Sequence, residues 1–294
     1  MRPMFTGRHA AAGGFQNRSA NKFPRRKASK MAFNKMRVFG AGIAILAMSF
    51  AAFAQAPATP TQAPATAPAV TSPAATLPSA DQILDKYVAA IGGEAAWHKL
   101  NSRVSKGTIE IPAMSLSGTV EVHDKAPDSS LAVVSLGGAT FQRGCDGTTA
   151  WADDPQNGLR TLSGAEAEDS KRQADFYHQI NMRKYYSNWK VTGTEKIGEH
   201  DAYVVEATSL AGDVDKMYFD TQSGLMLRAI TTLHTAQGAA VIQSELSDYR
   251  DTDGIKLPFK VHQSSAQTEY TITFSEVHHN VDLSDGQFAK PAAQ

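Results

Sequence analysis

The chain contains 294 residues with 29 basic and 29 acidic side chains, and its formal net charge at pH 7 is zero. The balance is uneven, because residues 1–37 hold ten Lys and Arg residues and no carboxylate, and residues 38–80 hold no charge. The remainder carries 19 basic against 29 acidic residues, and this acidic excess disfavours binding to nucleic acids and anionic membranes, which require a basic surface.

Residues 1–30 form a basic extension, which we interpret as disordered or as preceding the true translation start. Residues 31–54 have the features of a secretory signal peptide: a basic start, an apolar run from Val38 to Phe50 and an A-x-A sequence that ends at Ala54. The run is shorter than the roughly 20 residues that span a bilayer as a helix. We therefore predict cleavage after Ala54 and a periplasmic or secreted protein, with retention of the segment as a membrane anchor as the alternative.

Residues 55–78 are mostly Ala, Pro and Thr without charge. Such a segment buries too little apolar area to fold, so we interpret it as a linker. A single folded domain is predicted over residues 79–294, which is long enough to bury a sizeable core. Cys145 is the only cysteine, so no internal disulfide can form; it is either a small buried residue or a reactive thiol.

Two helices have recognisable starts. Ser79 and Gln82 have the spacing of a capping box, and apolar residues at helical spacing follow as far as Gly92 and its glycine neighbour. A shorter second helix is expected directly afterwards. Ser163 begins another capping-box pattern, and the sequence from 165 to about 186 contains no Pro or Gly, which predicts a further helix there.

From Ser102 onward the hydrophobic period is two, which predicts strands. Turn residues recur about every ten positions, as in an antiparallel meander and not in βαβ units. The order of elements predicts one large antiparallel sheet with helices against one face. The predicted strands after the one around 116–122 are 131–136, 140–145, 148–151, 190–197, 202–209, 216–220, 225–233, 240–249, 255–263 and 268–278.

Several strands are apolar on both faces, for example Leu131–Val134 and Tyr203–Val205. A sheet with one face in water should alternate cleanly, so both faces must be covered. Either an apolar pocket between helices and sheet or an ordinary filled core satisfies this pattern.

Motifs for catalysis and for cofactors are missing from the sequence. There is no H-E-x-x-H, G-x-S-x-G, G-x-G-x-x-G, P-loop or C-x-x-C pattern. The histidines are scattered, and the adjacent His278 and His279 would point to opposite faces of a strand. Asp251 and Asp253 begin a calcium-loop pattern, but His262 stands where the closing glutamate is needed. We therefore predict no metal, no cofactor and no enzymatic activity.

Five short motifs resemble the LolA/LolB-like periplasmic lipoprotein-carrier superfamily (outer membrane lipoprotein-sorting protein-like), which also includes envelope sensors and mycobacterial lipid carriers. They occur in the family's order over about residues 79 to 291. These motifs are Gly118–Val122, Lys125–Asp128, Asp146–Trp151, Tyr218–Leu225 and Asp253–Pro258. One departure is Ala126, because in the carrier proper an arginine that serves ligand release precedes this proline.

The resemblance implies an α+β fold: a single large curved antiparallel sheet, a half-closed barrel of about 11 strands, with helices covering the concave face and an apolar cavity for acyl chains. It implies an exported, monomeric, non-enzymatic binder or carrier of lipid or lipoprotein acyl chains. An envelope sensor or protein-interaction module on the same fold is the alternative, and a hydrolase using scattered His and Asp is a third hypothesis. Parity and apolarity give the expected cavity wall as Val120, Val122, Trp151, Phe176, Tyr177, Ile180, Phe219 and Leu227.

Overall fold

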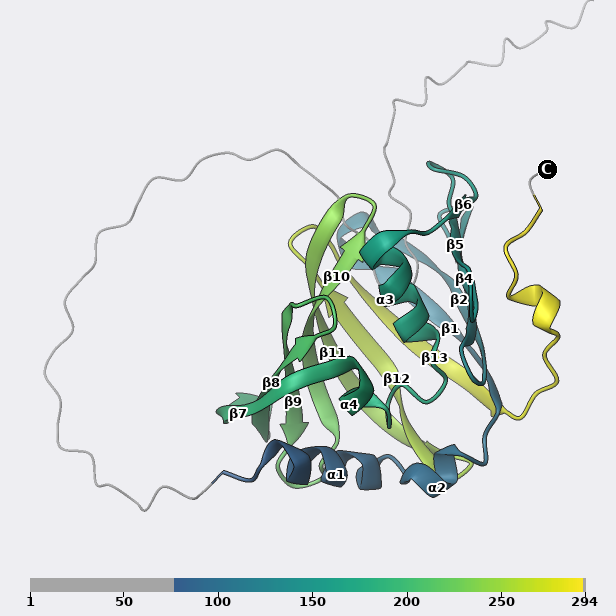
Figure 1. Cartoon of the computed structure of the whole chain (residues 1–294). Coiled ribbons are helices and arrows are strands. Elements are labelled where there is room, and N and C mark those ends of the chain that lie inside the picture. Colours follow the sequence, from purple (N-terminus) through teal and green to yellow (C-terminus); the bar gives the residue numbers. More distant parts are fainter. Residues whose placement is uncertain (1–76, 293–294) are drawn as a thin grey trace, which may run out of the picture. The chain divides into compact units, whose positions relative to one another are not determined.

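The computed structural model describes residues 77–292. These residues form one antiparallel sheet of thirteen strands, accompanied by four α-helices (Figure 1). The predicted basic extension and signal peptide, and all but the last two residues of the predicted linker, lie outside the described residues.

The helices are α1 (Ala80–Ala90), α2 (Glu94–Trp97), α3 (Gly164–Ala174) and α4 (Met182–Tyr185), with short 3₁₀ turns η1 (Pro112–Met114) and η2 (Asp285–Gln287). The strands are β1 (Ser102–Ile111), β2 (Leu116–Lys125), β3 (Ser129–Leu136), β4 (Ala139–Asp146), β5 (Ala150–Asp153), β6 (Arg160–Thr161), β7 (Tyr186–Ile197), β8 (His200–Ser209), β9 (Val214–Asp220), β10 (Met226–Thr235), β11 (Gly238–Thr252), β12 (Ile255–Ser264) and β13 (Glu269–His279).

The first helix begins and ends where the sequence predicts. Ser79 Oγ accepts a hydrogen bond from the Gln82 amide at 3.2 Å, and Gln82 Oε1 accepts one from the Ser79 amide at 2.9 Å. This reciprocal capping box satisfies two backbone donors at the helix start. The helix ends at glycines in the left-handed region, where the Gly93 amide donates to the Val88 carbonyl at 2.8 Å.

The helix predicted from 165 to about 186 is wrong in length. It is interrupted after α3, because the Asp175 carboxylate accepts hydrogen bonds from the Tyr177 amide at 2.9 Å and from the Tyr185 hydroxyl at 2.6 Å. These bonds replace the helical ladder with a turn, and α4 follows as a single turn. Ser163 makes no capping hydrogen bond, so the second predicted capping box is also wrong.

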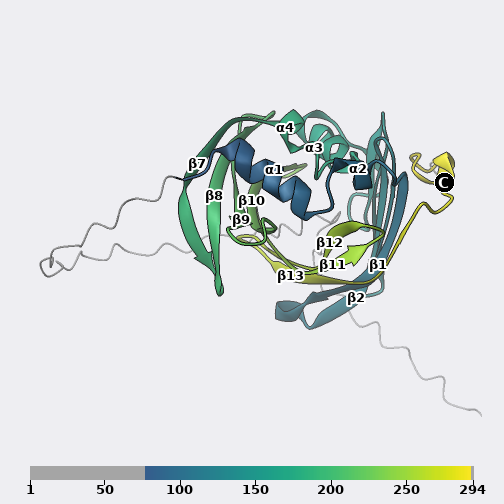
Figure 2. The same cartoon turned by 90° about the horizontal axis from the view of Figure 1, so that it is seen from below.

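The sheet is strongly curved and open at its two edges, β6 and β7. Its strand order is β6-β5-β4-β3-β2-β1-β13-β12-β11-β10-β9-β8-β7. Helix α3 contacts both β4 and β10, although six strands separate them in the sheet, so the sheet must curl around the helix. Figure 2 shows the four helices lying across the opening of this curve.

The predicted fold class is therefore confirmed, with a corrected strand number. The sheet has thirteen strands where about eleven were predicted. One addition, β6, is only two residues long, which is too short to produce a visible alternation of polar and apolar residues.

The main core lies between the helices α1 and α2 and the concave face of strands β8, β9, β10 and β12. Tyr87 of α1 packs edge-on against Phe219 of β9, with ring centroids 5.3 Å apart. Both side chains are almost completely buried. Apolar contact of this kind, and not helix propensity, fixes α1 to the sheet.

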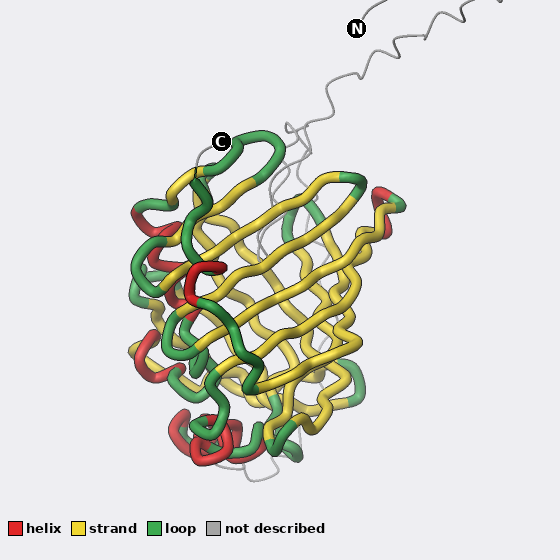
Figure 3. The backbone as a smooth tube through the Cα atoms, turned by 90° about the vertical axis from the view of Figure 1, so that its right-hand side faces the viewer, coloured by secondary structure: helices red, strands yellow, loops and turns green. Residues whose placement is uncertain are grey.

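The C-terminal segment covers part of the convex face of the sheet, beside β1 and β4 (Figure 1). Phe288 is fully buried there against Val104 and Leu283. Its carbonyl accepts a hydrogen bond from Trp151 Nε1 at 2.8 Å. Figure 3 shows the slanted strands of this side of the molecule together with the segment that crosses them.

Candidate functional site

A cavity of about 300 Å³ lies between the concave face of the sheet and helices α1, α2 and α3. Strands β1 to β4 form one side of it and strands β11 to β13 the other. Its surface is mostly apolar. The volume is at the lower end of the range of about 300–1,000 Å³ found for small-molecule pockets.

One row of register partners builds the floor of this cavity. Val277, Ser105, Val122, Ala132 and Arg143 lie opposite one another on β13, β1, β2, β3 and β4. All five line the cavity. Because side chains of register partners project from the same face of a sheet, this row is continuous, and its small members leave the space open.

The next row toward the other end of the same strands is filled. There Phe274, Gly107, Val120, Val134 and Phe141 are register partners. Val120, Val134 and Phe141 are 1%, 4% and 3% exposed and belong to a packed cluster. The hollow therefore ends where large side chains follow small ones along the strands.

The structure separates the residues that parity and apolarity select as cavity wall. Val122 lines the cavity, whereas Val120 lies in the filled row. Phe176, Ile180 and Phe219 lie in the main core cluster.

The remaining three predicted wall residues lie elsewhere. Tyr177 packs against the main core and donates its hydroxyl to the Leu100 carbonyl at 3.0 Å. Trp151 lies on the convex face under the C-terminal segment. Leu227 packs against the cluster that contains Tyr218, on the face opposite to Phe219. Of the eight residues, the structure thus places one, Val122, on the cavity wall.

Sequence reasoning missed most of the wall. Ala132, Val261 and Phe274 line the cavity, as do Ile91 and Trp97 from the helical side. The strand alternation was visible in the sequence, but the register that brings Ala132 beside Val122 was not. An alternation pattern identifies the face of a residue, and only the register identifies its neighbours.

Two charged groups in the cavity wall balance each other. Arg103 donates from Nη2 and Nε to Asp124 Oδ2, at 2.6 and 3.1 Å. Asp124 Oδ1 also accepts from the Ser130 hydroxyl at 2.8 Å. This pair satisfies both charges internally and holds β1, β2 and β3 together.

A third charged group, Arg143, is less well compensated. Its side chain is 10% exposed, and its Nε donates to Ser170 Oγ of α3 at 3.2 Å. Its closest carboxylate oxygen is Glu166 Oε1, at 3.9 Å from Nη2. Glu166 already binds Arg160 through both oxygens, at 2.7 and 2.8 Å. Burial is the largest cause that lowers the pKa of Arg143.

The single thiol also faces the cavity. Cys145 is 1% exposed and pairs with Ser130 across β3 and β4. Burial is the main cause that raises its pKa. A raised pKa and low exposure make the thiol a poor nucleophile, so the chemistry of this residue is that of a small wall residue.

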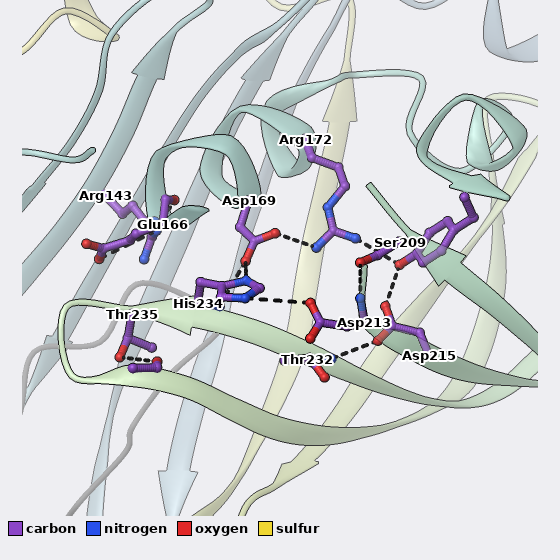
Figure 4. Close-up of polar contacts among 12 residues, drawn as sticks. Arg143, Glu166, Asp169, Arg172, Ser209, Asp213, Asp215, Thr232, His234 and Thr235 are labelled. Atoms are coloured by element: carbon purple, nitrogen blue, oxygen red, sulfur yellow. Dashed lines mark hydrogen bonds and ion pairs between the residues drawn. The ribbon is translucent and has the colours of Figure 1, made fainter. Parts of the chain in front are cut away.

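Helix α3 is fixed over the cavity by ion pairs and hydrogen bonds (Figure 4). Asp169 Oδ2 accepts hydrogen bonds from the His234 amide at 2.8 Å and lies 2.9 Å from His234 Nδ1. Arg172 of the same helix donates to the Tyr186 hydroxyl at 2.8 Å, and that hydroxyl lies 3.0 Å from Asp215 Oδ2. Burial raises the pKa of Asp215 and of Tyr186. Polar contacts thus link α3 directly to β7 and β10, and through Tyr186 to β9.

A second hollow, of about 540 Å³, lies on the other side of α3. Its wall carries charges of both signs, including Asp128, Glu168, Lys171 and Lys184. The mixture of charges favours water over an apolar ligand, so the first cavity is the candidate site.

The described residues contain no group of three or more His, Cys, Asp or Glu side chains placed to hold a metal ion. Within the same range, no helix is both long and apolar enough to cross a membrane.

The architecture, an open curved antiparallel sheet with short helices across its opening, is the one that the motif resemblance implies. No family model and no curated protein matches the chain. Among solved structures, a DUF1329 family protein from Desulfovibrio piger is similar with a TM-score of 0.50 and 16% identity, over 72% of this chain and 97% of that one. At such identity the similarity shows the fold alone.

Two further solved structures are similar at lower TM-scores. A LolA superfamily protein from Nitrosomonas europaea has a TM-score of 0.47 and 16% identity, over 73% of this chain and 99% of that one. A domain described as outer membrane lipoprotein-sorting, from Vibrio parahaemolyticus, has a TM-score of 0.46 and 13% identity, over 72% of this chain and 96% of that one.

Proposed function

We propose that this protein is an exported, non-enzymatic binder or carrier of lipid or lipoprotein acyl chains in the cell envelope. The observation that carries the proposal is the cavity of about 300 Å³ between the concave sheet and helices α1 to α3, with its mostly apolar wall. The motif resemblance and the predicted signal peptide are consistent with it.

The size of the cavity sets the expected ligand. An engineered apolar cavity of about 150 Å³ holds one benzene molecule, with six carbon atoms. On that scale about 300 Å³ holds roughly ten to twelve carbons, which is a large part of one acyl chain. Burial of ten methylenes contributes about 8 kcal/mol, of which at least about 4 kcal/mol is offset by lost ligand freedom. The net gain is therefore at most about 4 kcal/mol, which corresponds to a dissociation constant of about 1 mM or weaker for a chain held by burial alone.

The test is a titration of the purified protein with a fluorescent fatty acid, together with mass spectrometry of lipid that co-purifies under native conditions. Ala132→Phe places a large ring in the cavity floor and should weaken binding at least about tenfold. Val133→Phe is the matched control, because Val133 pairs with Glu121 and Gln142 on the opposite face of the same strand. Equal binding by both variants, or no binding by the unmodified protein, would refute the proposal.

A second candidate function is an envelope sensor or interaction module that binds another protein. Leu210 and Val214, in and beside the β8–β9 turn, are 77% and 61% exposed. Exposed large apolar side chains close together favour a contact surface. Under this alternative, Leu210→Asp should abolish co-purification of an envelope protein partner while fatty-acid binding stays unchanged.

A further inference from the structure

The wall of the cavity contains one buried cation that lacks its own anion. Arg143 projects from β4 into the floor row, between Ala132 of β3 and Ala152 of β5. Neither neighbour in the sheet carries a polar side chain. Its hydrogen-bond partners among residues 77–292 are the neutral Ser170 hydroxyl and the Glu166 carbonyl.

The carboxylate closest to Arg143 is committed elsewhere. Glu166 makes a bidentate salt bridge with Arg160, at 2.7 and 2.8 Å, and its Oε1 lies 3.9 Å from Arg143 Nη2. Two guanidinium groups therefore share one carboxylate. Asp169, on the next turn of α3, is bonded to Arg172 and to His234.

A buried charge without a matched partner is costly, and a ligand that supplies the missing charge gains a strong interaction. The other arginine in the wall, Arg103, does not offer this, because Asp124 neutralises it at 2.6 Å. Within the described part of the chain, Nη1 of Arg143 makes no hydrogen bond, so this donor remains for a ligand. Arg143 therefore places one cationic group at the wall of an otherwise mostly apolar space.

We propose that the natural ligand is a single-chain amphiphile with an anionic head, and that the head pairs with Arg143 while the chain occupies the apolar remainder of the cavity. This inference rests on the proposed function and specifies its ligand class. Ser170, which accepts from Arg143 Nε, positions the guanidinium. A carboxylate and a phosphate monoester share the required chemistry, since a guanidinium binds either through two parallel N–H donors.

The experiment measures the affinity of the unmodified protein for three ligands with the same chain: decanoate, decyl phosphate and 1-decanol, by calorimetry at pH 7.5. At least one acid should bind about tenfold or more tightly than decanol, as expected for a charge-assisted pair. The tighter acid identifies the head. Equal affinity for all three overturns the inference and leaves the proposed function intact, whereas no binding of any ligand overturns both.

Variants assign the preference to one side chain. Arg143→Gln should remove the acid preference and leave decanol affinity within about twofold. Arg228→Gln is the matched control, because it removes a partly buried guanidinium that is paired with Glu245 and is not part of the cavity wall; the acid preference should persist in this variant. An acid preference that survives Arg143→Gln overturns the inference.

A second pair of variants keeps the arginine in place. Ala132 is the register partner of Arg143 on the same face, so Ala132→Glu supplies an internal carboxylate beside the guanidinium. In Ala132→Glu, the ratio of acid affinity to decanol affinity should fall to about one. Ala132→Gln has nearly the same volume without the charge and should keep that ratio. Equal ratios in these two variants overturn the inference, even if Arg143→Gln fails to fold.

Discussion

The stability of this protein should fall in mild acid through His178, in the turn between α3 and α4. Burial is the largest cause that lowers the pKa of His178, to about 4 from 6.5, and the neighbouring Arg172 and Lys184 lower it further. Its Nδ1 is buried without a partner among the described residues, and its ring packs on Tyr185 with centroids 5.1 Å apart. The folded state therefore keeps this imidazole neutral.

The sign and size of the effect follow from linkage. The pKa of His178 in the folded state lies below its unfolded value, so the unfolded chain binds more protons and stability falls as the pH drops below about 6.5. At pH 5 the unfolded imidazole is about 97% protonated and the folded one about 10%, which corresponds to a loss of about 2 kcal/mol relative to pH 7.5. The loss grows to its limit only as the pH passes below about 4.

Urea unfolding at pH 7.5 and pH 5 measures this loss. His178→Phe keeps an aromatic ring against Tyr185 and removes the titration, so its free energy of unfolding should fall about 2 kcal/mol less over this range than that of the unmodified protein. Other titrating groups contribute equally to both proteins and cancel. His278→Phe, on a ring that is 64% exposed, is the matched control. A pH dependence of His178→Phe equal to that of the unmodified protein would refute the reasoning.

Three further predictions concern packing and access. Gly92→Ala should lower the free energy of unfolding by more than about 2 kcal/mol, because Gly92 has φ +112° and an added Cβ would overlap the Gly254 carbonyl. Gly93→Ala, with open space around the added Cβ, should lower it by about 1 kcal/mol, and urea unfolding measures both losses. Phe288→Ala should cost about 3–5 kcal/mol by the same assay, because the side chain is fully buried, and should leave decanoate affinity unchanged because Phe288 lies on the convex face. Cys145 should react with a disulfide reagent at pH 8 at least about tenfold more slowly in the folded protein than in urea, and bound decanoate should slow it further because Cys145 lines the cavity.

Local hydrogen bonds explain which helix boundaries could be predicted. The start of α1 depends on Ser79 and Gln82 alone, three residues apart, so the sequence pattern was sufficient. The same pattern at Ser163 failed because Glu166 forms a two-pronged pair with Arg160 and is not free to cap the helix. A tertiary ion pair that outcompetes a local cap is invisible to a local pattern.

The large sheet was predictable for a similar reason. Strand alternation and the turns between strands are local, and in an antiparallel meander each strand pairs with its neighbour in the chain. The exception is β1, the first strand, which pairs with β13, the last strand, so that the two ends of the domain lie side by side in the middle of the sheet. That contact joins residues about 170 positions apart, and only the motif resemblance anticipated the curved sheet that it creates.

The cavity depends on the register, and this explains why only one of the eight residues chosen by parity lies on its wall. Val120 and Val122 are equivalent in sequence: both are apolar, on the same strand and on the same face. Val122 faces a hollow because its partners are Ser105 and Ala132, whereas Val120 is packed in because Val134 and, beyond it, a phenylalanine follow in its row. The size of side chains that lie ten to twenty residues away in the chain thus decides whether a position borders empty space. A longer β2–β3 turn that shifts this register would fill the cavity without changing the composition of the strands.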